Sequence, residues 1–481
     1  MPERVAVLGA GVGGLAAASR LAKDGYQVDV YEKLPACGGR NNLICEAGFK
    51  FDTGPSFVMM PDFFEEIFSY CGQDIKDYLD LRVLEKSYKI VYADGRQFTV
   101  HRDSRLTLGE MEKIEPGSSA RFEDFILETG RIYGLVRPLL YKCVTLKDLF
   151  NPAYLSLAGR IRAFDSYWKL ARKYFKSREL CYAFTFEAMF MGVSPYRAPA
   201  FYSVITYADH AQKIFHSMGG MYRIPLALEK LASRFGANFH YGCEVEKIEK
   251  ENGKFTLSCG NERFKADYLV VNADYPYTQT DLLDRRIPDF EYSCSTYLVY
   301  LGLKRKLEGL EHHNLFFSGD LDKNLDQIFK KKTVPEDPSF YVHLPTVTDP
   351  SLAPEGKEIV YLLIPVPNLK NPQHRFKDHE SRIRKQVFDK INKSCGCDLA
   401  KLVEVERRFY PEDFTGRYNI KFGATFGLAH NLLQSAFFRP ANKDPKLRNL
   451  YYVGASTQPG GGLPVVIAGS RIVAEMIKRG G

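Results

Sequence analysis

The sequence has few of the features that mark metal-binding proteins or hydrolases. Its ten cysteines form no CxxC pair, and Cys395 and Cys397 are one residue too close for the usual zinc spacing. The ten histidines form no cluster at ligand spacing with cysteines, and we find no Ser/His/Asp or Cys/His signature. We therefore expect no metal, no hydrolase chemistry, and reduced cysteines of the kind found inside cells.

Long apolar segments are also missing. No run of eighteen or more apolar residues occurs, so we expect no membrane-spanning helix. The first residues lead directly into an expected strand and show no signal-peptide pattern. These observations predict a cytoplasmic protein that does not span a membrane, and they leave open that it lies on one.

The composition is that of a folded protein. The 481 residues allow about three domains or fewer. Hydrophobic residues make up 45% and charged residues 26%, which excludes a mainly disordered chain. The net charge of +8 (66 − 58) is mild for this length, and no nucleic-acid-binding motif accompanies it. We expect no nucleic-acid partner.

A glycine-rich motif follows the first expected strand. Residues 5–8 are apolar, and Gly9, Gly11 and Gly14 match the pattern GxGxxG. Glycines permit a tight turn, and the free N–H groups of the following helix can hold a pyrophosphate. The second strand ends at Glu32, whose carboxylate suits ribose hydroxyls and disfavours a 2′-phosphate. This order of elements predicts a Rossmann-type dinucleotide site that does not take NADP.

Further loops of the same kind lie elsewhere in the chain. Residues 38–40 and 51–56 bring glycines close after the acid, which suits a longer cofactor, and Arg40 can add positive charge at its pyrophosphate. Near the other end, residues 454–462 form a glycine-rich loop between an expected strand and an expected helix over 465–477. Both ends of the chain therefore contribute to one cofactor site.

The segment after residue 213 is expected to return to the same domain. Residues 243–248 alternate like a strand, a hairpin is expected over 255–265, and 267–274 resemble a buried strand with a polar end. Val245 either binds an adenine through its backbone or belongs to the core. Between these blocks, the second of two insertions has strand-like runs at 297–301, 340–344 and 359–365, which favour a sheet that carries the substrate.

One segment of the first insertion accounts for the whole net positive charge. Between Arg131 and Arg178 there are eleven basic residues and two acids. Nine aromatic residues lie among them: Tyr133, Tyr141, Phe150, Tyr154, Phe164, Tyr167, Trp168, Tyr174 and Phe175. Basic and aromatic residues mixed on helices favour a surface that binds anionic lipid headgroups, with a solvated helical face as the alternative.

These motifs together resemble the bacterial-type phytoene desaturase family, which includes dehydrosqualene desaturases. The resemblance runs nearly end to end. It rests on the dinucleotide motif and on residues 51–56, 219–221, 345–356, 426–428, 434–440 and 454–464. The family implies a non-covalent FAD, a fold similar to flavin amine oxidases, peripheral membrane association, and stepwise dehydrogenation of a long polyisoprenoid.

The resemblance and the motifs together predict an α/β (α+β) fold with three parts. We expect a Rossmann-type FAD-binding domain from residues 1–95, 211–280 and 441–481, a helical membrane-associating insertion at 96–210, and a substrate domain at 281–440. The predicted FAD contacts are Gly9, Ala10, Gly11, Gly13, Gly14, Glu32, Lys33, Gly39, Arg40, Gly54, Pro55, Ser56, Val245, Asn272, Asp274, Gly454, Ala455, Gly462, Leu463, Pro464 and Val465.

One position departs from the family. Where the family usually has Thr-His-Pro-Gly, this chain has Thr457-Gln458-Pro459-Gly460. An amide does not titrate near neutral pH, so a proton-transfer role at Gln458 is not expected. The sequence does not name the catalytic base: Asp165, His210 and His216 are polar residues in apolar surroundings, and each is more often structural.

The leading hypothesis is an FAD-dependent desaturase that acts on phytoene, dehydrosqualene or a later intermediate of carotenoid biosynthesis. The alternatives with the same fold are a carotene isomerase, which causes no net oxidation, and a carotenoid terminal oxygenase. An amine oxidase and a non-enzymatic polyene-binding membrane protein are more distant. Tightly bound FAD would count against the non-enzymatic alternative, which has no need of a dinucleotide site.

Overall fold

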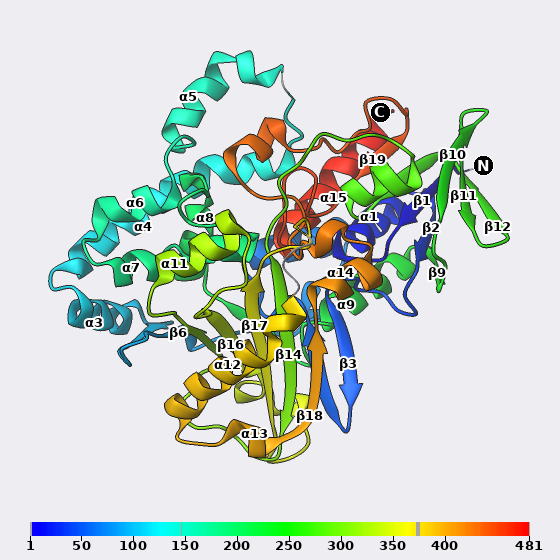
Figure 1. The fold of residues 1–481 in the computed structure, drawn as a ribbon. Helices are drawn as coiled ribbons and strands as arrows, with labels where there is room; N and C mark the ends of the chain where they lie inside the picture. Colours follow the sequence, from blue (N-terminus) through cyan, green and yellow to red (C-terminus); the bar gives the residue numbers. More distant parts are fainter. Residues whose placement is uncertain (1, 146, 372–375, 481) are drawn as a thin grey trace.

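The computed structural model describes residues 2–145, 147–371 and 376–480. Three distant parts of the chain build a five-stranded parallel sheet, shown on the right of Figure 1. In spatial order its strands are β19 (Leu450–Tyr452), β13 (Tyr268–Val271), β1 (Arg4–Leu8), β2 (Gln27–Glu32) and β9 (Asn238–Tyr241). Because parallel strands are covered on both faces, β1 and β13 are almost entirely buried, as their apolar runs predict.

Three helices cover this sheet closely. Helix α1 (Val12–Lys23) packs against α9 (Arg223–Arg234) and α15 (Leu463–Lys478). The run Leu15–Ala18 is completely buried, since alanines let the helix approach its neighbours. This arrangement places the N-termini of α1 and α15 beside the glycine-rich loops.

A small antiparallel sheet follows β9. It consists of β10 (Lys247–Glu251), β11 (Lys254–Cys259) and β12 (Glu262–Ala266), which confirms the expected hairpin. The strand expected over 243–248 was placed too early, because residues 243–246 form no strand and β10 starts at Lys247. Cys243 and Cys259 lie side by side in this region, with Cα atoms 5.8 Å apart.

The second large sheet has seven strands. Their order is β18 (Val403–Phe409), β14 (Ser295–Leu303), β17 (Glu358–Val366), β16 (Phe340–His343), β15 (His313–Phe316), β6 (Lys86–Val91) and β7 (Gln97–His101). The three strands expected in the second insertion are thus present. Strand β6 pairs with β15 in this sheet, although it lies within the predicted first segment, 1–95.

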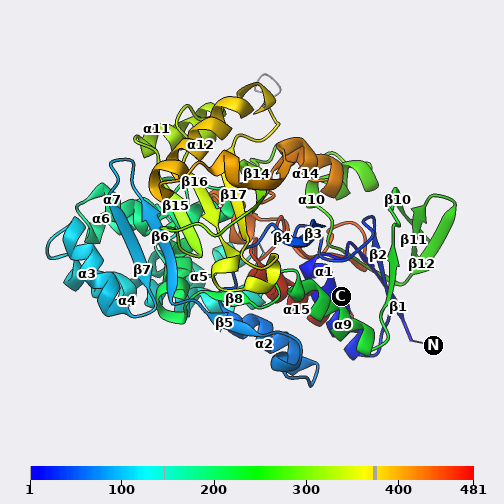
Figure 2. The same cartoon turned by 90° about the horizontal axis from the view of Figure 1, so that it is seen from below.

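Side chains alternate between the two faces of this sheet. Tyr297, Val299 and Leu301 pack with α12 (Glu380–Cys395) in one hydrophobic cluster, whereas Leu298 and Tyr300 belong to the main core. A strand with period two separates these sets. Figure 2 shows α12 over one face of the sheet, which leaves the other face for the cavity described below.

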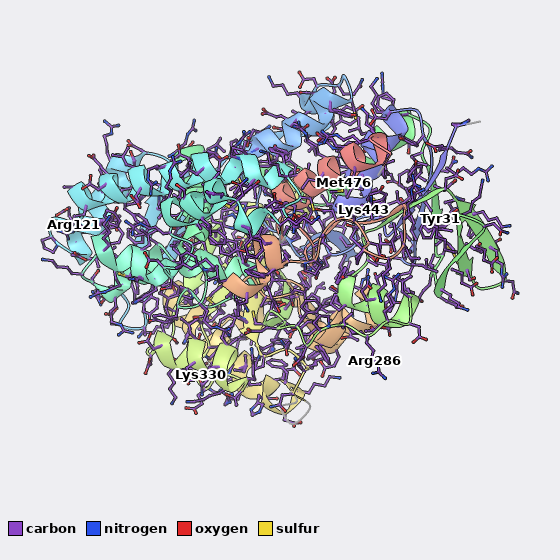
Figure 3. All side chains as sticks on the ribbon, turned by 90° about the horizontal axis from the view of Figure 1, so that it is seen from above. Tyr31, Arg121, Arg286, Lys330, Lys443 and Met476 are labelled. Carbon is purple, nitrogen blue, oxygen red and sulfur yellow. A yellow bond between two sulfur atoms is a disulfide. The ribbon has the colours of Figure 1, made fainter. Side chains whose placement is uncertain are left out.

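The helical insertion forms the left side of Figure 1. It contains α3 (Ser104–Ile114), α4 (Ser118–Val136), α5 (Pro152–Arg160), α6 (Tyr167–Tyr174), α7 (Arg178–Ala183) and α8 (Val204–Tyr207). Arg121 in α4 and Tyr31 in β2 lie at opposite ends of the molecule in Figure 3.

The structure corrects part of the expected lipid-binding surface. Tyr133, Tyr167 and Phe175 are buried in the protein, because their rings pack into the helical core instead of facing outward. By contrast, Phe150 and Phe164 are 82% and 78% exposed.

The remaining elements connect these parts. They are α2 (Pro61–Tyr70), α10 (Tyr275–Tyr277), α11 (Leu321–Asp326), α13 (Leu399–Leu402), α14 (Pro411–Tyr418), and the strand pairs β3 (Asn42–Glu46) with β4 (Phe49–Thr53) and β5 (Leu81–Val83) with β8 (Phe215–Ser217). Among the described residues, every helix is too short or too polar to cross a membrane.

Candidate functional site

One cavity runs between the two large sheets and collects the loops that the sequence singled out. It is lined by 19 of the 21 predicted contacts: Gly9, Gly11, Gly13, Glu32, Lys33, Gly39, Arg40, Gly54, Pro55, Ser56, Val245, Asn272, Asp274, Gly454, Ala455, Gly462, Leu463, Pro464 and Val465. The other two, Ala10 and Gly14, lie in the turn behind the lining. The residues named from three distant segments therefore share one site.

Glu32 closes the first glycine turn. The N–H of Ala10 donates to Glu32 Oε2 at 2.8 Å, and the N–H of Leu34 donates to Oε1 at 2.9 Å. Burial raises the pKa of Glu32 above its ordinary value, although these backbone donors oppose the shift. Ala10 thus contributes by fixing the acid, and Glu32 keeps free lone pairs toward the cavity.

The turn is shaped to admit a ligand close to its backbone. A side-chain carbon on Gly14 would lie 2.1 Å from the carbonyl oxygen of Gly9, and one on Gly11 or Gly13 would lie 2.6 Å from the amide of Asn272. No side chain caps the N-terminus of α1, where Gly11 is the N-cap residue. The first N–H groups of this helix are therefore available to an anion.

Arg40 supplies positive charge at the same place. Its only hydrogen bond to the described residues runs from Nη1 to the carbonyl oxygen of Thr425, at 2.5 Å. Desolvation lowers its pKa, while the nearby Asp274 opposes the shift. Asp274 in turn accepts from Ser456 Oγ at 3.0 Å and from the N–H of Lys421 at 3.2 Å. The remaining guanidinium donors fit a pyrophosphate, so this end of the cavity suits FAD.

Two of the motifs behind the resemblance contact each other directly. Asp52 accepts from the N–H groups of Met221 at 2.7 Å and Tyr222 at 2.9 Å. A side chain on Gly220 would collide with this carboxylate, which explains the glycine at that position. Burial raises the pKa of Asp52 to about 6. The contact fixes the turn that precedes α9.

A buried arginine organises the C-terminal loop. Arg439 is 2% exposed and donates to five backbone carbonyl oxygens without a carboxylate partner among the described residues. These carbonyls belong to Leu428, Ala429, Gln434, Ala455 and Thr457. Arg439 therefore joins the loop at 428–434 to the loop that follows β19.

Gln458 has a structural position. Its Oε1 accepts from the N–H of Val144 and its Nε2 donates to the carbonyl of the same residue, both at 2.8 Å. The side chain is buried and does not line the cavity. Gln458, which stands where the family usually has histidine, therefore links the C-terminal loop to the helical insertion through these hydrogen bonds.

The other end of the cavity is aromatic. Phe57, Phe186, Phe190 and Phe317 line it, and their rings lie in a connected group: Phe57 to Phe190 at 5.2 Å, Phe190 to Phe186 at 5.4 Å, and Phe186 to Phe317 at 6.3 Å. We call these four rings the aromatic lining. Methionine and leucine side chains at Met59, Met189 and Leu315 extend it. Such a surface binds a ligand by shape and burial, because it has no charge to offer.

Sequence reasoning missed one histidine of the cavity. His430 lines it and is buried; its Nδ1 lies 3.1 Å from the carbonyl oxygen of Met191, and its Nε2 accepts from the N–H of Gly461 at 3.1 Å. These contacts assign the proton to Nδ1, and burial keeps the pKa of His430 well below its ordinary value. No periodicity in the sequence marks this residue.

The three candidate bases lie elsewhere. Asp165 pairs with Arg162 and Lys169 on the helical insertion, and these pairs hold its pKa below its ordinary value. His210 lies in a buried group with Glu187 and Asp209. None of the three candidates lines the cavity.

The fold and this site define a flavin-dependent oxidoreductase with two layers of sheet around one cavity. Solved structures share this fold: a mutant of putrescine oxidase has a TM-score of 0.68 at 14% identity, with 100% of this chain and 99% of that chain covered. Cyclohexylamine oxidase from Brevibacterium oxydans has a TM-score of 0.61 at 15% identity, with complete coverage of both chains.

The chain belongs to the flavin containing amine oxidoreductase family, which matches residues 12–477. The zeta-carotene-forming phytoene desaturase of Myxococcus xanthus is 40% identical over 99% of this chain and 94% of its own length. The 4,4'-diapophytoene desaturase (4,4'-diaponeurosporene-forming) of Staphylococcus aureus strain Newman is 33% identical over 99% of both. The chain is thus a flavoenzyme, and its cofactor is FAD, as the sequence predicted.

Proposed function

We propose that the protein is an FAD-dependent desaturase of a long polyisoprenoid carotenoid precursor, with phytoene as the preferred substrate. The observation that carries the proposal is the continuity of one cavity from the glycine turns to the aromatic lining. The two desaturases that resemble the chain end to end support the reaction, and the higher identity to the phytoene enzyme favours the longer substrate.

In this proposal the residues divide into two groups. Backbone donors at the start of α1 and the guanidinium of Arg40 hold the pyrophosphate, Glu32 holds the ribose, and the backbone at Val245 lies along the adenine. FAD, when bound, supplies the acceptor for a hydride. The 21 predicted contacts are the cofactor-binding set of this proposal.

The aromatic lining receives the hydrocarbon. Phe186 and Phe317 exclude water from the reacting carbons, and their ring faces stabilise positive charge that develops on the chain as a hydride leaves. Neutral His430 lies at the junction of the two ends, where its fixed tautomer holds Gly461 in place. It orients the loop at the cofactor.

An anaerobic mixture of FAD-loaded protein with liposomes tests the reaction. With phytoene in the bilayer, we expect the oxidised flavin band to bleach and a product two hydrogens lighter to appear. Dehydrosqualene in matched liposomes should react more slowly, and empty liposomes should not react. An unchanged substrate mass with altered geometry would instead show an isomerase, and an added oxygen would show an oxygenase.

We propose further that the protein is a peripheral membrane protein, bound through the tip formed by residues 147–160. Helix α5 has no buried residue and stands out at the top of Figure 1. Phe150 and Leu155 are exposed there, and Lys147 and Arg160 flank them in the sequence and are also exposed. Apolar side chains framed by basic residues suit the boundary of an anionic bilayer.

Liposome flotation tests this surface. The double variant Phe150→Ser with Leu155→Ser should lose binding to anionic liposomes, whereas Leu106→Ser, an exposed leucine on α3, should not. Binding by the wild type should weaken as salt screens the charges. Retention of binding by the double variant would refute the role of the tip.

A further inference from the structure

Three buried histidines from distant segments meet beyond the wall of the cavity. His216 lies in β8, His312 directly precedes β15, and His343 ends β16; they are 0%, 3% and 2% exposed. One ring nitrogen of each lies within 4.8 Å of the others, and the Nε2 atoms of His312 and His343 are 3.0 Å apart. The spacing is that of side chains around a common centre.

The three rings are enclosed by the protein, and their centroids lie close together: His216 is 5.0 Å from His312, and His312 is 4.8 Å from His343. A neutral imidazole offers one lone pair, which is the form that binds metals. Both ring nitrogens of His216 lack a hydrogen-bond partner among the described residues, an unusual state for a completely buried side chain.

The groups around the rings are those that orient metal-binding imidazoles. His312 Nδ1 lies 2.7 Å from Thr348 Oγ1, and His216 Nε2 lies 3.6 Å from Asp349 Oδ2. Asp349 is itself fixed by the N–H of Gly219 at 2.5 Å. A hydroxyl or carboxylate near the second nitrogen sets the tautomer and points the first nitrogen at the ion.

We propose that His216, His312 and His343 bind one zinc-type divalent ion, with water as its fourth ligand. Three imidazoles suit zinc and the neighbouring transition metals, and a tetrahedral ion needs four ligands. The ion joins β8, whose partner is β5, to β15 and β16 of the seven-stranded sheet. Its role is to hold these two sheets together beside the substrate cavity.

A fourth histidine gives a matched control. His313 is equally buried and stacks against His343, with ring centroids 5.0 Å apart, but its Nδ1 bonds the Tyr341 hydroxyl at 2.6 Å. Tyr341 donates to Ser56 Oγ at 2.8 Å on the cavity wall. His313 is therefore hydrogen-bonded to a residue of the cavity wall and is not one of the three proposed metal ligands.

Metal analysis of the purified, FAD-containing protein tests the site without reference to its activity. We expect about one zinc per chain by mass spectrometry of the dialysed protein. Cobalt added to chelator-treated protein should give the visible bands of a tetrahedral Co²⁺ centre. Both His216→Gln and His343→Gln should abolish the bands, whereas His313→Gln should keep them. Asp349→Asn should weaken binding by about 10- to 100-fold.

A second test uses the wild-type protein, so it does not require that the histidine variants fold. Zinc should raise the midpoint of thermal unfolding of chelator-treated wild type, because an ion that binds only the folded state stabilises it. Substoichiometric zinc together with no cobalt spectrum and no thermal shift in the wild type would overturn the proposal, and would leave the cluster as hydrogen-bonded histidines. Retention of the cobalt bands in His216→Gln would overturn it as well.

Discussion

Replacement of Gly14 by alanine tests the cofactor site most directly. The added carbon would lie 2.1 Å from the Gly9 carbonyl oxygen and 3.1 Å from Asn272 Cβ. The first contact is with backbone at the tightest point of the turn, so α1 must move away from β1 to relieve it. Overpacking of this kind costs about 1–3 kcal/mol. Because 1.4 kcal/mol is tenfold in affinity, FAD binding should weaken by about 5- to 150-fold.

Titration of the apoprotein with FAD, followed by flavin fluorescence, measures this change. The matched control is Gly109→Ala in α3, where a side-chain carbon meets nothing within 4 Å. Since alanine favours a helix interior by about 0.5–1 kcal/mol over glycine, the control should bind FAD normally and unfold at a slightly higher temperature. An unchanged dissociation constant in Gly14→Ala would refute the placement of the pyrophosphate at this turn.

Three further variants test the surroundings of the cavity. Arg439→Met leaves five buried carbonyls without their donor and should lower the free energy of unfolding by at least about 3 kcal/mol in urea denaturation; a loss below 1 kcal/mol would contradict its organising role. Burial and the nearby Asp209 raise the pKa of Glu187 to about 8, so the folded protein keeps a proton that the unfolded chain loses. The free energy of unfolding should then fall by up to about 1.4 kcal/mol per pH unit between pH 5 and 8, and Glu187→Gln should flatten this slope; an identical slope would refute the shift. Gln458→His should lower the midpoint of thermal unfolding, since an imidazole cannot both accept from and donate to Val144, while flavin reduction changes little; slower flavin reduction at unchanged stability would contradict this assignment.

Local patterns in the sequence predict which loops meet in the cavity. The turn at Gly9 to Gly14 and the loop after β19 each combine a buried strand, glycines and a helix start, and each element depends mainly on its own residues. The order of these elements therefore places Glu32 and Pro464 in the same cavity without any knowledge of tertiary contacts. The resemblance to a known family supplied the fold and the substrate class.

Local patterns do not predict the features that depend on contacts between distant segments. Tyr167 and Phe175 have the sequence neighbours of a lipid-binding surface, but helix packing buries both rings. Composition shows that aromatic and basic residues alternate along the chain and does not show which face of a helix each one occupies. His430 escapes notice for a related reason, since its partners are backbone groups that only the fold brings near.

The histidine cluster shows why spacing rules miss a site of this kind. His216 precedes His312 by almost a hundred residues, so no motif with short spacing includes both. Strand pairing places His313 opposite His343, and the contact with β8 adds His216. A bound ion would join the segments from which strand register gathers these ligands. For that reason, removal of the metal should loosen the contact between β8 and the seven-stranded sheet, and hydrogen exchange at residues 215–217 should rise while exchange in α1 stays unchanged.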